Sequence, residues 1–255
     1  GSHKNDRKSL KKELILWRDD KDTKKINSEK DFKTEADVRA HNFLSDGLNE
    51  LYPGVVVLSE EDTIHNKNRP EKYLLLDPID GTASWYHGYD GFVSQAAYIE
   101  KNIPQFGIIH APVMNKTWTA TLGQGAFLNS SPMKKLSTGK RVKFIDNTNV
   151  PHGITKKLMS YLNATDYLEC GSIGLKSVLV ADGTVDLFVK DVYVRDWDLA
   201  PVAVILKEVG GCLVQANGEQ YDFEGEFQKE NGFIVARDLT LLSSALKAYI
   251  KLQIK

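Results

Sequence analysis

Two short apolar runs of this 255-residue chain end directly in carboxylates, and this feature constrains the fold more than any other. The first, Val55-Val56-Val57-Leu58, leads into Ser59-Glu60-Glu61-Asp62. The second, Tyr73-Leu74-Leu75-Leu76, leads into Asp77-Pro78-Ile79-Asp80-Gly81-Thr82. Short β-prone runs bounded by turn residues predict strands, so the acids should lie at the edge of a sheet, where loops form functional sites. The chain is therefore predicted to contain a sheet with an acidic site at its edge.

A cluster of carboxylates such as this one is unfavourable unless a cation neutralises it. Each acid loses hydration when it is buried, and it repels its neighbours. Because no cluster of His or Cys accompanies these oxygens, Mg²⁺ or Mn²⁺ is favoured over Zn²⁺. Two such ions about 3.5–4 Å apart would clamp a phosphate and turn a bound water into a nucleophile. Taken singly, however, Glu60-Glu61-Asp62 reads as a solvated loop and Asp80-Gly81-Thr82 as a turn.

The apolar pattern predicts two halves of different architecture. Amphipathic helices are expected at 10–17 and 34–51, and six β-prone runs between residues 55 and 128 predict a mostly antiparallel sheet. From residue 142 the pattern alternates, with strands expected at 142–145, 185–189 and 233–236 and helices at 154–162, 172–182, 198–209 and from 239 onward. We therefore divide the chain into an N-terminal α+β half, residues 4–140, with the main metal site, and a C-terminal α/β half, residues 141–255, which completes it. We expect the halves to pack tightly as one unit.

The composition argues against several other classes of protein. Hydrophobic residues make up 42% and charged residues 26% of the chain, as in soluble globular proteins. The net charge of -1 is not the concentrated basic excess that binding to a nucleic-acid polymer requires. No apolar run approaches the roughly 20 residues that span a bilayer, so we expect no stable membrane insertion. The two cysteines, Cys170 and Cys212, form no C-x-x-C pair, and a reduced, cytoplasmic setting is expected.

Three blocks of the chain, in order, resemble the inositol monophosphatase superfamily, the lithium-sensitive, magnesium-dependent phosphatases. Ser59-Glu60-Glu61-Asp62 resembles its first acidic block, and Asp77-Pro78-Ile79-Asp80-Gly81-Thr82 matches its signature hexapeptide. Trp197-Asp198-Leu199-Ala200, followed by Glu208-Val209-Gly210-Gly211, resembles its C-terminal Trp-Asp block. The resemblance extends from about Thr34 to Ala236. It implies a layered αβαβα sandwich of α+β / α/β class and a phosphomonoester hydrolase with two or three Mg²⁺ ions, for which Mn²⁺ can substitute.

The resemblance also implies roles for individual residues. One ion would be held by Glu60, Asp77 and the carbonyl of Ile79, a second by Asp77, Asp80 and Asp198, and a weaker third would touch Glu60. The catalytic residues would be Thr82, supported by Asp37 of the stretch Lys33-Thr34-Glu35-Ala36-Asp37, and Glu61. The substrate would contact Gly81, Thr82, Gly171, Ser172, Ile173, Lys176 and Asp191. A metal-activated water would attack directly, because the chain has no Cys-x5-Arg motif and no Asp-x-Asp at the start of a Rossmann-like strand.

Ordinary structural roles compete with some of these assignments. Asp198 and Ser172 both fit the N-cap of a helix, and a capping carboxylate at Asp198 can still face a cleft. Asp37 fits an exposed acid within a helix, and Lys176 a lysine on a helix surface. Asp191 fits a solvated loop. The sequence leaves these alternatives open.

The substrate is also left open. The segment from Val57 to Asp62, the run Ala111-Pro112-Val113-Met114-Asn115 and Lys176 resemble the CysQ-type 3′(2′),5′-bisphosphate nucleotidases, which convert adenosine 3′,5′-bisphosphate to AMP. Those enzymes usually follow the signature with Lys-x-Phe, whereas Ala83-Ser84-Trp85 stands here.

An inositol monophosphatase, or a sugar or histidinol phosphate phosphatase, is the alternative to a nucleotidase. A catalytically silent metal-binding relative is an alternative of another class, against which the complete set of ligands argues. A scaffold protein is a third class, and we find no repeat or amphipathic docking helix to support it. The expected partners are a small phosphate monoester and, in a homodimer, a second copy of the chain.

Overall fold

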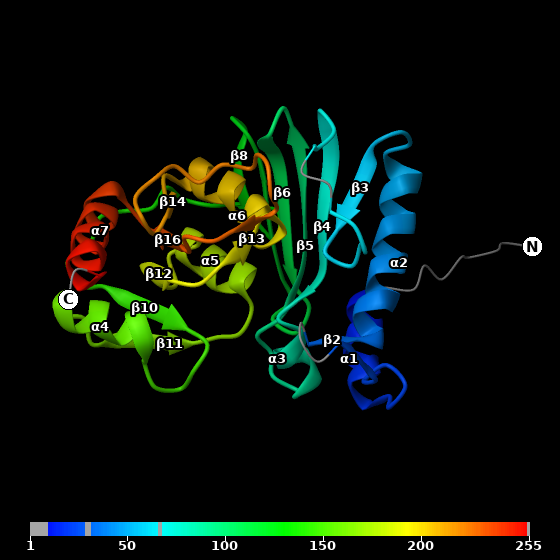
Figure 1. Ribbon diagram of the computed structural model, residues 1–255, viewed down its shortest axis with the longest axis horizontal. Helices are drawn as coiled ribbons and strands as arrows, with labels where there is room; N and C mark the ends of the chain where they lie inside the picture. Colours follow the sequence, from blue (N-terminus) through cyan, green and yellow to red (C-terminus); the bar gives the residue numbers. More distant parts are fainter. Residues whose placement is uncertain (1–9, 29–31, 66–67, 254–255) are drawn as a thin grey trace, which may run out of the picture.

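Five layers alternate between helices and sheets in the computed structural model, which describes residues 10–28, 32–65 and 68–253 (Figure 1). One outer layer packs on the first sheet, a central pair of helices lies between the two sheets, and the other outer layer packs on the second sheet. In that order the helices are α1 (Leu10–Leu16) and α2 (Glu35–Leu51), α5 (Ile173–Ala181) and α6 (Asp196–Val209), and α4 (Gly153–Tyr161) and α7 (Leu239–Gln253). The αβαβα sandwich that we expected is confirmed.

The first sheet has seven strands in chain order and carries the acidic loops. Its strands are β3 (Val56–Ser59), β4 (Lys72–Asp80), β5 (Val93–Glu100), β6 (Ile103–Ala111), β7 (Lys116–Thr121), β8 (Gly125–Leu128) and β9 (Ser131–Pro132). Every neighbouring pair is antiparallel except β3 and β4, which are parallel. Ser59 pairs with Leu76, so Glu60, the first residue after β3, lies beside Asp77 of β4. Parallel pairing of β3 and β4 is thus what joins the two acidic blocks.

The second sheet has five strands in the order β11-β10-β12-β16-β14. They are β10 (Lys143–Asp146), β11 (Asp166–Glu169), β12 (Leu187–Lys190), β14 (Cys212–Gln215) and β16 (Phe233–Ala236). The sequence pattern predicted the three central strands and missed β11 and β14, which form the two edges. Both edge strands are only partly buried, and β11 begins and ends with an acid, Asp166 and Glu169. Two further pairs are small: β1 (Ile26–Ser28) with β2 (Lys33–Thr34), and β13 (Val194–Arg195) with β15 (Gln228–Lys229).

Helix α6 connects the two halves, because it lies in the C-terminal half of the sequence but packs on β5, β6 and β7 of the first sheet. The approach is close at Gly107, where an added Cβ would lie 2.1 Å from the carbonyl oxygen of Pro201. We expected this helix to begin at Asp198. It begins at Asp196 with Arg195 as its N-cap, so Asp198 is in the first turn and is not the cap. Our division of the chain at residue 140 stays a prediction.

The structure bears on two expectations, the absence of membrane insertion and the reduced state of the cysteines. Within the described residues, no helix is both long and apolar enough to cross a bilayer. Cys170 and Cys212 are both free thiols, the first buried and the second partly exposed. The cytoplasmic setting and the homodimer stay predictions.

Candidate active site

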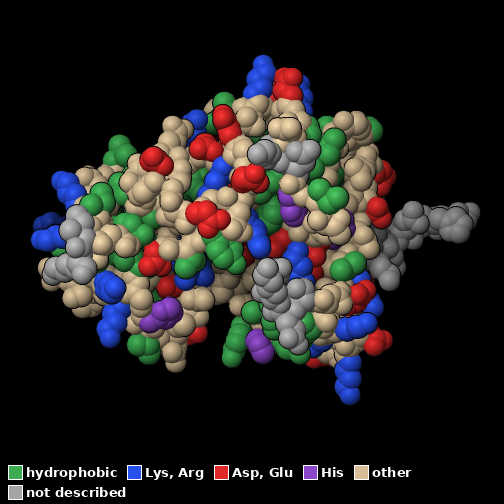
Figure 2. All heavy atoms as spheres, viewed as in Figure 1, with side chains coloured by type: hydrophobic (Ala, Val, Ile, Leu, Met, Phe, Trp, Pro, Cys, Tyr) green, Lys and Arg blue, Asp and Glu red, His purple; other side chains and the backbone are tan. Residues whose placement is uncertain are grey.

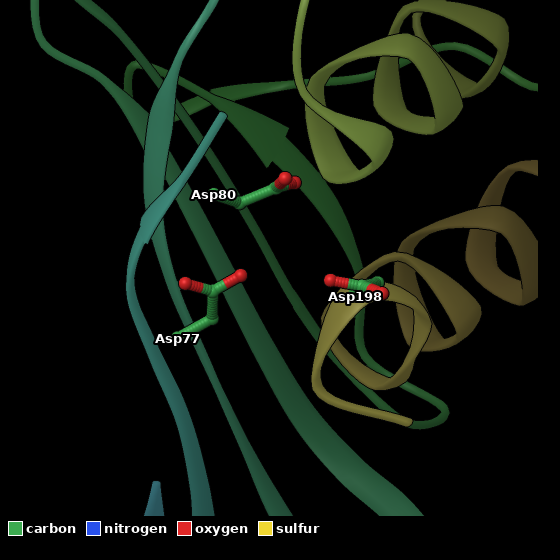
Figure 3. A group of neighbouring side chains, drawn as sticks. All are labelled: Asp77, Asp80 and Asp198. Carbon is green, nitrogen blue, oxygen red and sulfur yellow. The ribbon is translucent and has the colours of Figure 1, made fainter. Parts of the chain in front are cut away.

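Three aspartates converge at the junction of the first sheet and the central helices. One carboxylate oxygen from each of Asp77, Asp80 and Asp198 lies within 4.8 Å of the other two. Asp77 and Asp80 come from the end of β4, and Asp198 comes from the first turn of α6, so that all three point into one space (Figure 3). Residues three apart in a regular strand point to opposite faces. The pairing of β4 with β5 is irregular between Asp77 and Asp80, and this irregularity brings both to the same side.

Burial makes this aspartate cluster electrostatically costly. Burial and repulsion by the neighbouring carboxylates raise the pKa of Asp77 and of Asp198 well above their usual range. Burial also raises the pKa of Asp80, although Asp80 accepts hydrogen bonds from the Ser172 hydroxyl at 2.6 Å and from the Gly174 N–H at 2.5 Å. Oδ1 of Asp77 is buried and has no hydrogen-bond partner. A buried oxygen without a donor is rare in folded proteins. Because no side chain of the described residues satisfies this oxygen, it can bind a cation from solution.

The two glutamates differ from the aspartates because cationic side chains lie beside them. Burial raises the pKa of Glu60 to about 7, while Lys33 acts in the opposite direction. Nη1 of Arg195 lies 3.6 Å from Oε1 of Glu60. Nζ of Lys33 lies 3.1 Å from Oε1 of Glu61, and it donates to the backbone carbonyl of Glu60 at 2.8 Å. Part of the negative charge is therefore neutralised by the protein itself.

The oxygens gathered here fit a hard divalent cation. The carboxylates of Asp77, Asp80 and Asp198 converge, and Glu60 is next to Asp77 in the sheet edge. No imidazole or thiolate belongs to this group of the described residues, and oxygen-only sites suit Mg²⁺ or Mn²⁺. The carbonyl oxygen of Ile79 lies at the same strand end, 3.0 Å from Oγ1 of Thr82. The residues present therefore fit the metal ions that the sequence led us to expect.

Asp37 and Thr82 form a hydrogen-bonded pair beside the metal ligands. Oγ1 of Thr82, the first residue of α3 (Thr82–Tyr86), donates to Oδ1 of Asp37 at 2.8 Å. Oδ2 of Asp37 accepts from the N–H and the hydroxyl of Thr34 at 2.6 and 2.7 Å. Burial raises the pKa of Asp37 to about 6, against the effect of these hydrogen bonds. Asp37 is 2% exposed, so the alternative of an exposed helix acid is wrong.

Two glycines allow the loops around the site to touch. Gly81 has a φ of 91°, in the left-handed region that favours glycine, and a Cβ there would lie 2.8 Å from the carbonyl oxygen of Gly91. At Gly171 a Cβ would lie 2.1 Å from Oγ of Ser84. Ser172 is the N-cap of α5 as well as a donor to Asp80, so its two readings are compatible. These contacts join α3 from the N-terminal half to α5 from the C-terminal half.

A cavity of about 780 Å³ opens beside Asp80 and extends between the two halves. Its surface opening lies in the notch between α3 and the β10–β11 side of the molecule (Figure 2). Its walls include the expected substrate contacts Gly81, Gly171, Ser172, Ile173 and Lys176. Lys176 is 2% exposed, because α5 lies in the central layer, so it is not a surface lysine.

Asp191 does not line this cavity, whereas its neighbours Lys190 and Val192 do. The Asp191 side chain is exposed and acts on the pKa of Tyr249 in α7, so we no longer place it at the substrate. Asp191 is the first residue after the end of β12.

Lys190 and Asn147 line the cavity and were missed by the sequence analysis. They stand at the carboxyl ends of β12 and β10, which are parallel neighbours. Ligands of open α/β sheets bind at such ends, and this rule applied to the predicted strands would have found both residues. Lys190 pairs with Asp146 at 2.6 Å. Burial, helped by the charge of Lys190, lowers the pKa of Lys176 to about 8.

The three residues that follow the signature hexapeptide have different surroundings. Ala83 and Ser84 line the cavity. Trp85 is fully buried, and its indole Nε1 donates to the carbonyl of Leu14 at 2.8 Å. Trp85 therefore anchors α3 to α1. Ala83 presents a small, uncharged side chain to any ligand in the cavity.

Comparisons with known proteins agree with this geometry. A sequence profile described as the inositol monophosphatase family matches residues 9–251. The fructose-1,6-bisphosphatase/inositol-1-monophosphatase of Thermotoga maritima is 29% identical over 87% of this chain and 86% of its own. The 3′(2′),5′-bisphosphate nucleotidase CysQ of Haemophilus influenzae is 32% identical over 73% of this chain and 72% of its own. The structure of a Thermotoga maritima IMPase superposes with a TM-score of 0.79 at 24% identity, covering 95% of this chain and 92% of that one. The chain belongs to the inositol monophosphatase family of metal-dependent phosphatases and is a phosphomonoester hydrolase.

Proposed function

We propose that the chain hydrolyses one phosphate monoester of a small metabolite that carries a second phosphate, with adenosine 3′,5′-bisphosphate as the preferred substrate and AMP as the product. The observation that carries this proposal is the pair of lysines, Lys176 and Lys190, in the same cavity as Asp80. A substrate with one phosphate at the aspartates places its second anionic group within this cavity. The CysQ relative is named for such a substrate.

The surroundings of Lys176 support a second anion. Its ammonium lies 5.0 Å from the centre of the Phe188 ring, and among the described residues no carboxylate forms a salt bridge with it. A buried charge without a partner is costly, and a phosphate in the cavity would relieve that cost. With a pKa of about 8, Lys176 is mostly protonated at neutral pH and is ready to pair with an anion. Lys190 adds a second positive charge, partly offset by Asp146.

At the other phosphate, Mg²⁺ ions held by Glu60, Asp77, the Ile79 carbonyl, Asp80 and Asp198 would neutralise the phosphoryl oxygens and lower the pKa of a bound water. The chain's own part is to position the reacting groups. Since Asp37 accepts the proton of the Thr82 hydroxyl, a lone pair of Thr82 Oγ1 is directed to accept a hydrogen bond from the attacking water. The first N–H groups of α3, at Gly81 and Thr82, have no acceptor within the helix and would bind phosphate oxygens.

Glu61 has a supporting role in this proposal. Its carboxylate is paired with Lys33, and its charge contributes to the raised pKa of Asp37. We therefore place Glu61 behind the Asp37–Thr82 pair and assign it no contact with the reacting atoms. Gly171, Ser172 and Ile173 would line the side of the leaving group.

A second candidate is a phosphatase for inositol or sugar phosphates. The observation that favours it is Ala83, which lines the cavity where bisphosphate nucleotidases usually carry a lysine. The Thermotoga maritima relative is named for fructose 1,6-bisphosphate and inositol 1-phosphate. With alanine in place of lysine, the cavity next to α3 is wider and less positively charged, which would suit a polyol. A catalytically silent relative is disfavoured, because all the acidic residues expected to hold metal are present at the site.

The test is phosphate release in the presence of Mg²⁺, with and without Li⁺. The panel contains adenosine 3′,5′-bisphosphate, inositol 1-phosphate, histidinol phosphate and fructose 1,6-bisphosphate. We expect the highest kcat/KM for the adenosine bisphosphate. A higher kcat/KM for inositol 1-phosphate would show that Ala83, and not the lysine pair, is the feature that predicts the substrate class. Bound metal without turnover of any substrate would favour the silent relative.

The variant Lys176→Gln sharpens this test. Because a hydrogen bond to a charged group contributes about 1.5–3 kcal/mol, we expect KM for the adenosine bisphosphate to rise by about tenfold or more, with little change in kcat. Inositol 1-phosphate, which lacks the second phosphate, should be affected much less. Lys72→Gln is the matched control, since Lys72 pairs with Glu100 at the opposite end of β4 from the aspartates. An equal rise in KM for both substrates would mean that Lys176 does not bind a second phosphate.

A further inference from the structure

The acidic centre has two parts that differ in how their charge is balanced. In the first part, Asp77, Asp80 and Asp198 bring carboxylate oxygens within 4.8 Å of one another, and Oδ1 of Asp77 has no hydrogen-bond partner. In the second part, Glu60 and Glu61 are held by cationic side chains of the chain itself. The first part therefore needs cations from solution. In the second part Glu61 is already paired with a cation of the chain, and Glu60 lies between the two parts, close to Asp77 as well as to Lys33 and Arg195.

In the second part, Lys33 supplies the positive charge nearest to Glu61. Its Nζ lies 3.1 Å from Oε1 of Glu61 and donates to the carbonyl of Glu60 at 2.8 Å. The Lys33 side chain is 21% exposed and that of Glu61 is 9% exposed, so the pair is largely removed from solvent. Mg²⁺ at these oxygens would need ligand distances of about 2.0–2.1 Å, which places it against the ammonium group and in strong repulsion with it.

The position of Lys33 is set by the residues on either side. Phe32 packs edge-on against Tyr86 of α3 with 5.3 Å between ring centres. Thr34 is bonded to Asp37 at the start of α2 by its N–H and its hydroxyl. These contacts hold the backbone of Lys33 between α3 and α2. They therefore keep its ammonium group beside the glutamates.

We propose that the ammonium group of Lys33 acts as a built-in cation at the glutamate pair and limits the metal centre to two divalent ions. Arg195, whose Nη1 lies 3.6 Å from Glu60, adds to this effect from the side of α6. The five acids Glu60, Glu61, Asp77, Asp80 and Asp198 carry five negative charges when ionised. Lys33, Arg195 and two divalent ions supply six positive charges, one more than these acids carry, before the substrate phosphate adds its negative charge. A third divalent ion at the glutamate pair would have to displace Lys33 or Arg195 from these carboxylates.

The experiment counts bound metal. Metal-free protein is titrated with Mn²⁺, and the free ion is followed by its electron paramagnetic resonance signal. We expect two ions per chain for the wild type and three for Lys33→Met, with the third bound more weakly. The double variant Lys33→Met/Glu61→Gln should return to two, because the carboxylate that holds the added ion is gone. Lys72→Met, which removes a lysine from an ion pair outside the site, is the matched control and should bind two.

Three ions on the wild type would overturn the proposal, and that measurement does not depend on any variant folding correctly. Two ions on a folded Lys33→Met variant would overturn it as well. The inference uses the metal centre of the proposed function, but its outcome is independent of the substrate. Two ions without turnover on any substrate would contradict the proposed function and leave the role of Lys33 intact. Three ions with rapid turnover of the adenosine bisphosphate would do the reverse.

Discussion

Two buried aspartates in the first turn of α6 have opposite surroundings. Oδ2 of Asp196 pairs with Nη2 of Arg69 at 2.5 Å, and its Oδ1 accepts from the hydroxyl of Tyr221 at 2.9 Å. Asp198, two residues later, accepts from the N–H of Arg195 at 3.1 Å and otherwise faces Asp80 and Glu60. Burial and repulsion by these two acids raise its pKa. A buried carboxylate that the protein satisfies holds structure together, whereas one left facing other acids marks the place for a metal ion.

The partnered aspartate supports the unpartnered one. Arg69 donates to Tyr73 at 3.1 Å and to the carbonyl of Phe223 at 2.5 Å, and its guanidinium lies 4.0 Å from the centre of the Phe227 ring. Asp196 therefore ties the start of α6 to the loop before β4 and to the segment before β15. Since Asp198 follows in the same helical turn, this network positions the carboxylate that completes the aspartate cluster.

The largest expected effect is that of Asp198→Asn. The loss of a metal-ligating carboxylate removes several kcal/mol of charge stabilisation, so kcat/KM should fall by about 1000-fold or more. The metal-free variant should be more stable than the metal-free wild type, because a carboxylate that repels Asp80 and Glu60 is gone. Activity assays and thermal unfolding in EDTA measure both. Near-normal turnover would remove Asp198 from the site, and a less stable metal-free variant would contradict its unpartnered character.

For Asp196→Asn we expect the opposite pattern. Breaking a buried ion pair leaves the charge of Arg69 uncompensated, so the free energy of unfolding should fall by about 3 kcal/mol. Part of that loss should return in the double variant Asp196→Asn/Arg69→Met, which leaves no unpaired charge. Denaturant unfolding of the two variants with and without Mg²⁺ is the measurement. If Asp196→Asn lowered activity as much as Asp198→Asn and left stability unchanged, the distinction between the two aspartates would be wrong.

Asp37 is intermediate between these two, since it is buried and accepts from hydroxyl groups but has no cationic partner among the described residues. Its function depends on Thr82. We expect Thr82→Val to lower kcat by about 100-fold, the scale of a positioned proton acceptor, because the attacking water loses the oxygen that aligns it. KM and the number of bound Mn²⁺ ions should change little, and Thr82→Ser should recover most of kcat. A loss of metal binding in Thr82→Val would instead assign the residue to the metal site.

The smallest expected effect concerns the pH dependence of the metal-free protein. Glu60 has an ordinary pKa of 4.5 that is raised to about 7 in the folded chain, and that of Asp37 is raised to about 6. The folded state therefore holds protons that the unfolded state has released, so stability should fall as the pH rises from about 5 to 7. Thermal unfolding in EDTA should show a decrease of a few degrees, and saturating Mg²⁺ should remove the part due to Glu60. A stability that rises over this pH range in EDTA would contradict the burial of these acids.

Much of the fold and of the site was predictable because it depends on residues adjacent in the chain. The central strands of both sheets are apolar runs, and period-based patterns detect them. The edge strands β11 and β14, which are only partly buried, were missed. Asp77, Asp80 and Thr82 lie within six residues, so the sequence places them near one another, although the irregular pairing of β4 with β5 is what turns Asp77 and Asp80 to the same side. Asp191 was expected at the substrate from its place shortly before the Trp-Asp block, whereas its neighbours Lys190 and Val192 line the cavity.

The chemistry of the site follows from residue types that the sequence shows directly. Carboxylates select a hard cation, and the signature hexapeptide supplies two of them, Asp77 and Asp80. Tertiary structure decided which charges are balanced. Arg69 lies 127 residues from Asp196, and Lys33 lies 27 residues from the carbonyl it contacts. Such pairs form because burial makes an unpaired charge costly and selects a partner by its position in space. That selection separates the satisfied carboxylates of this protein from those that require a metal ion.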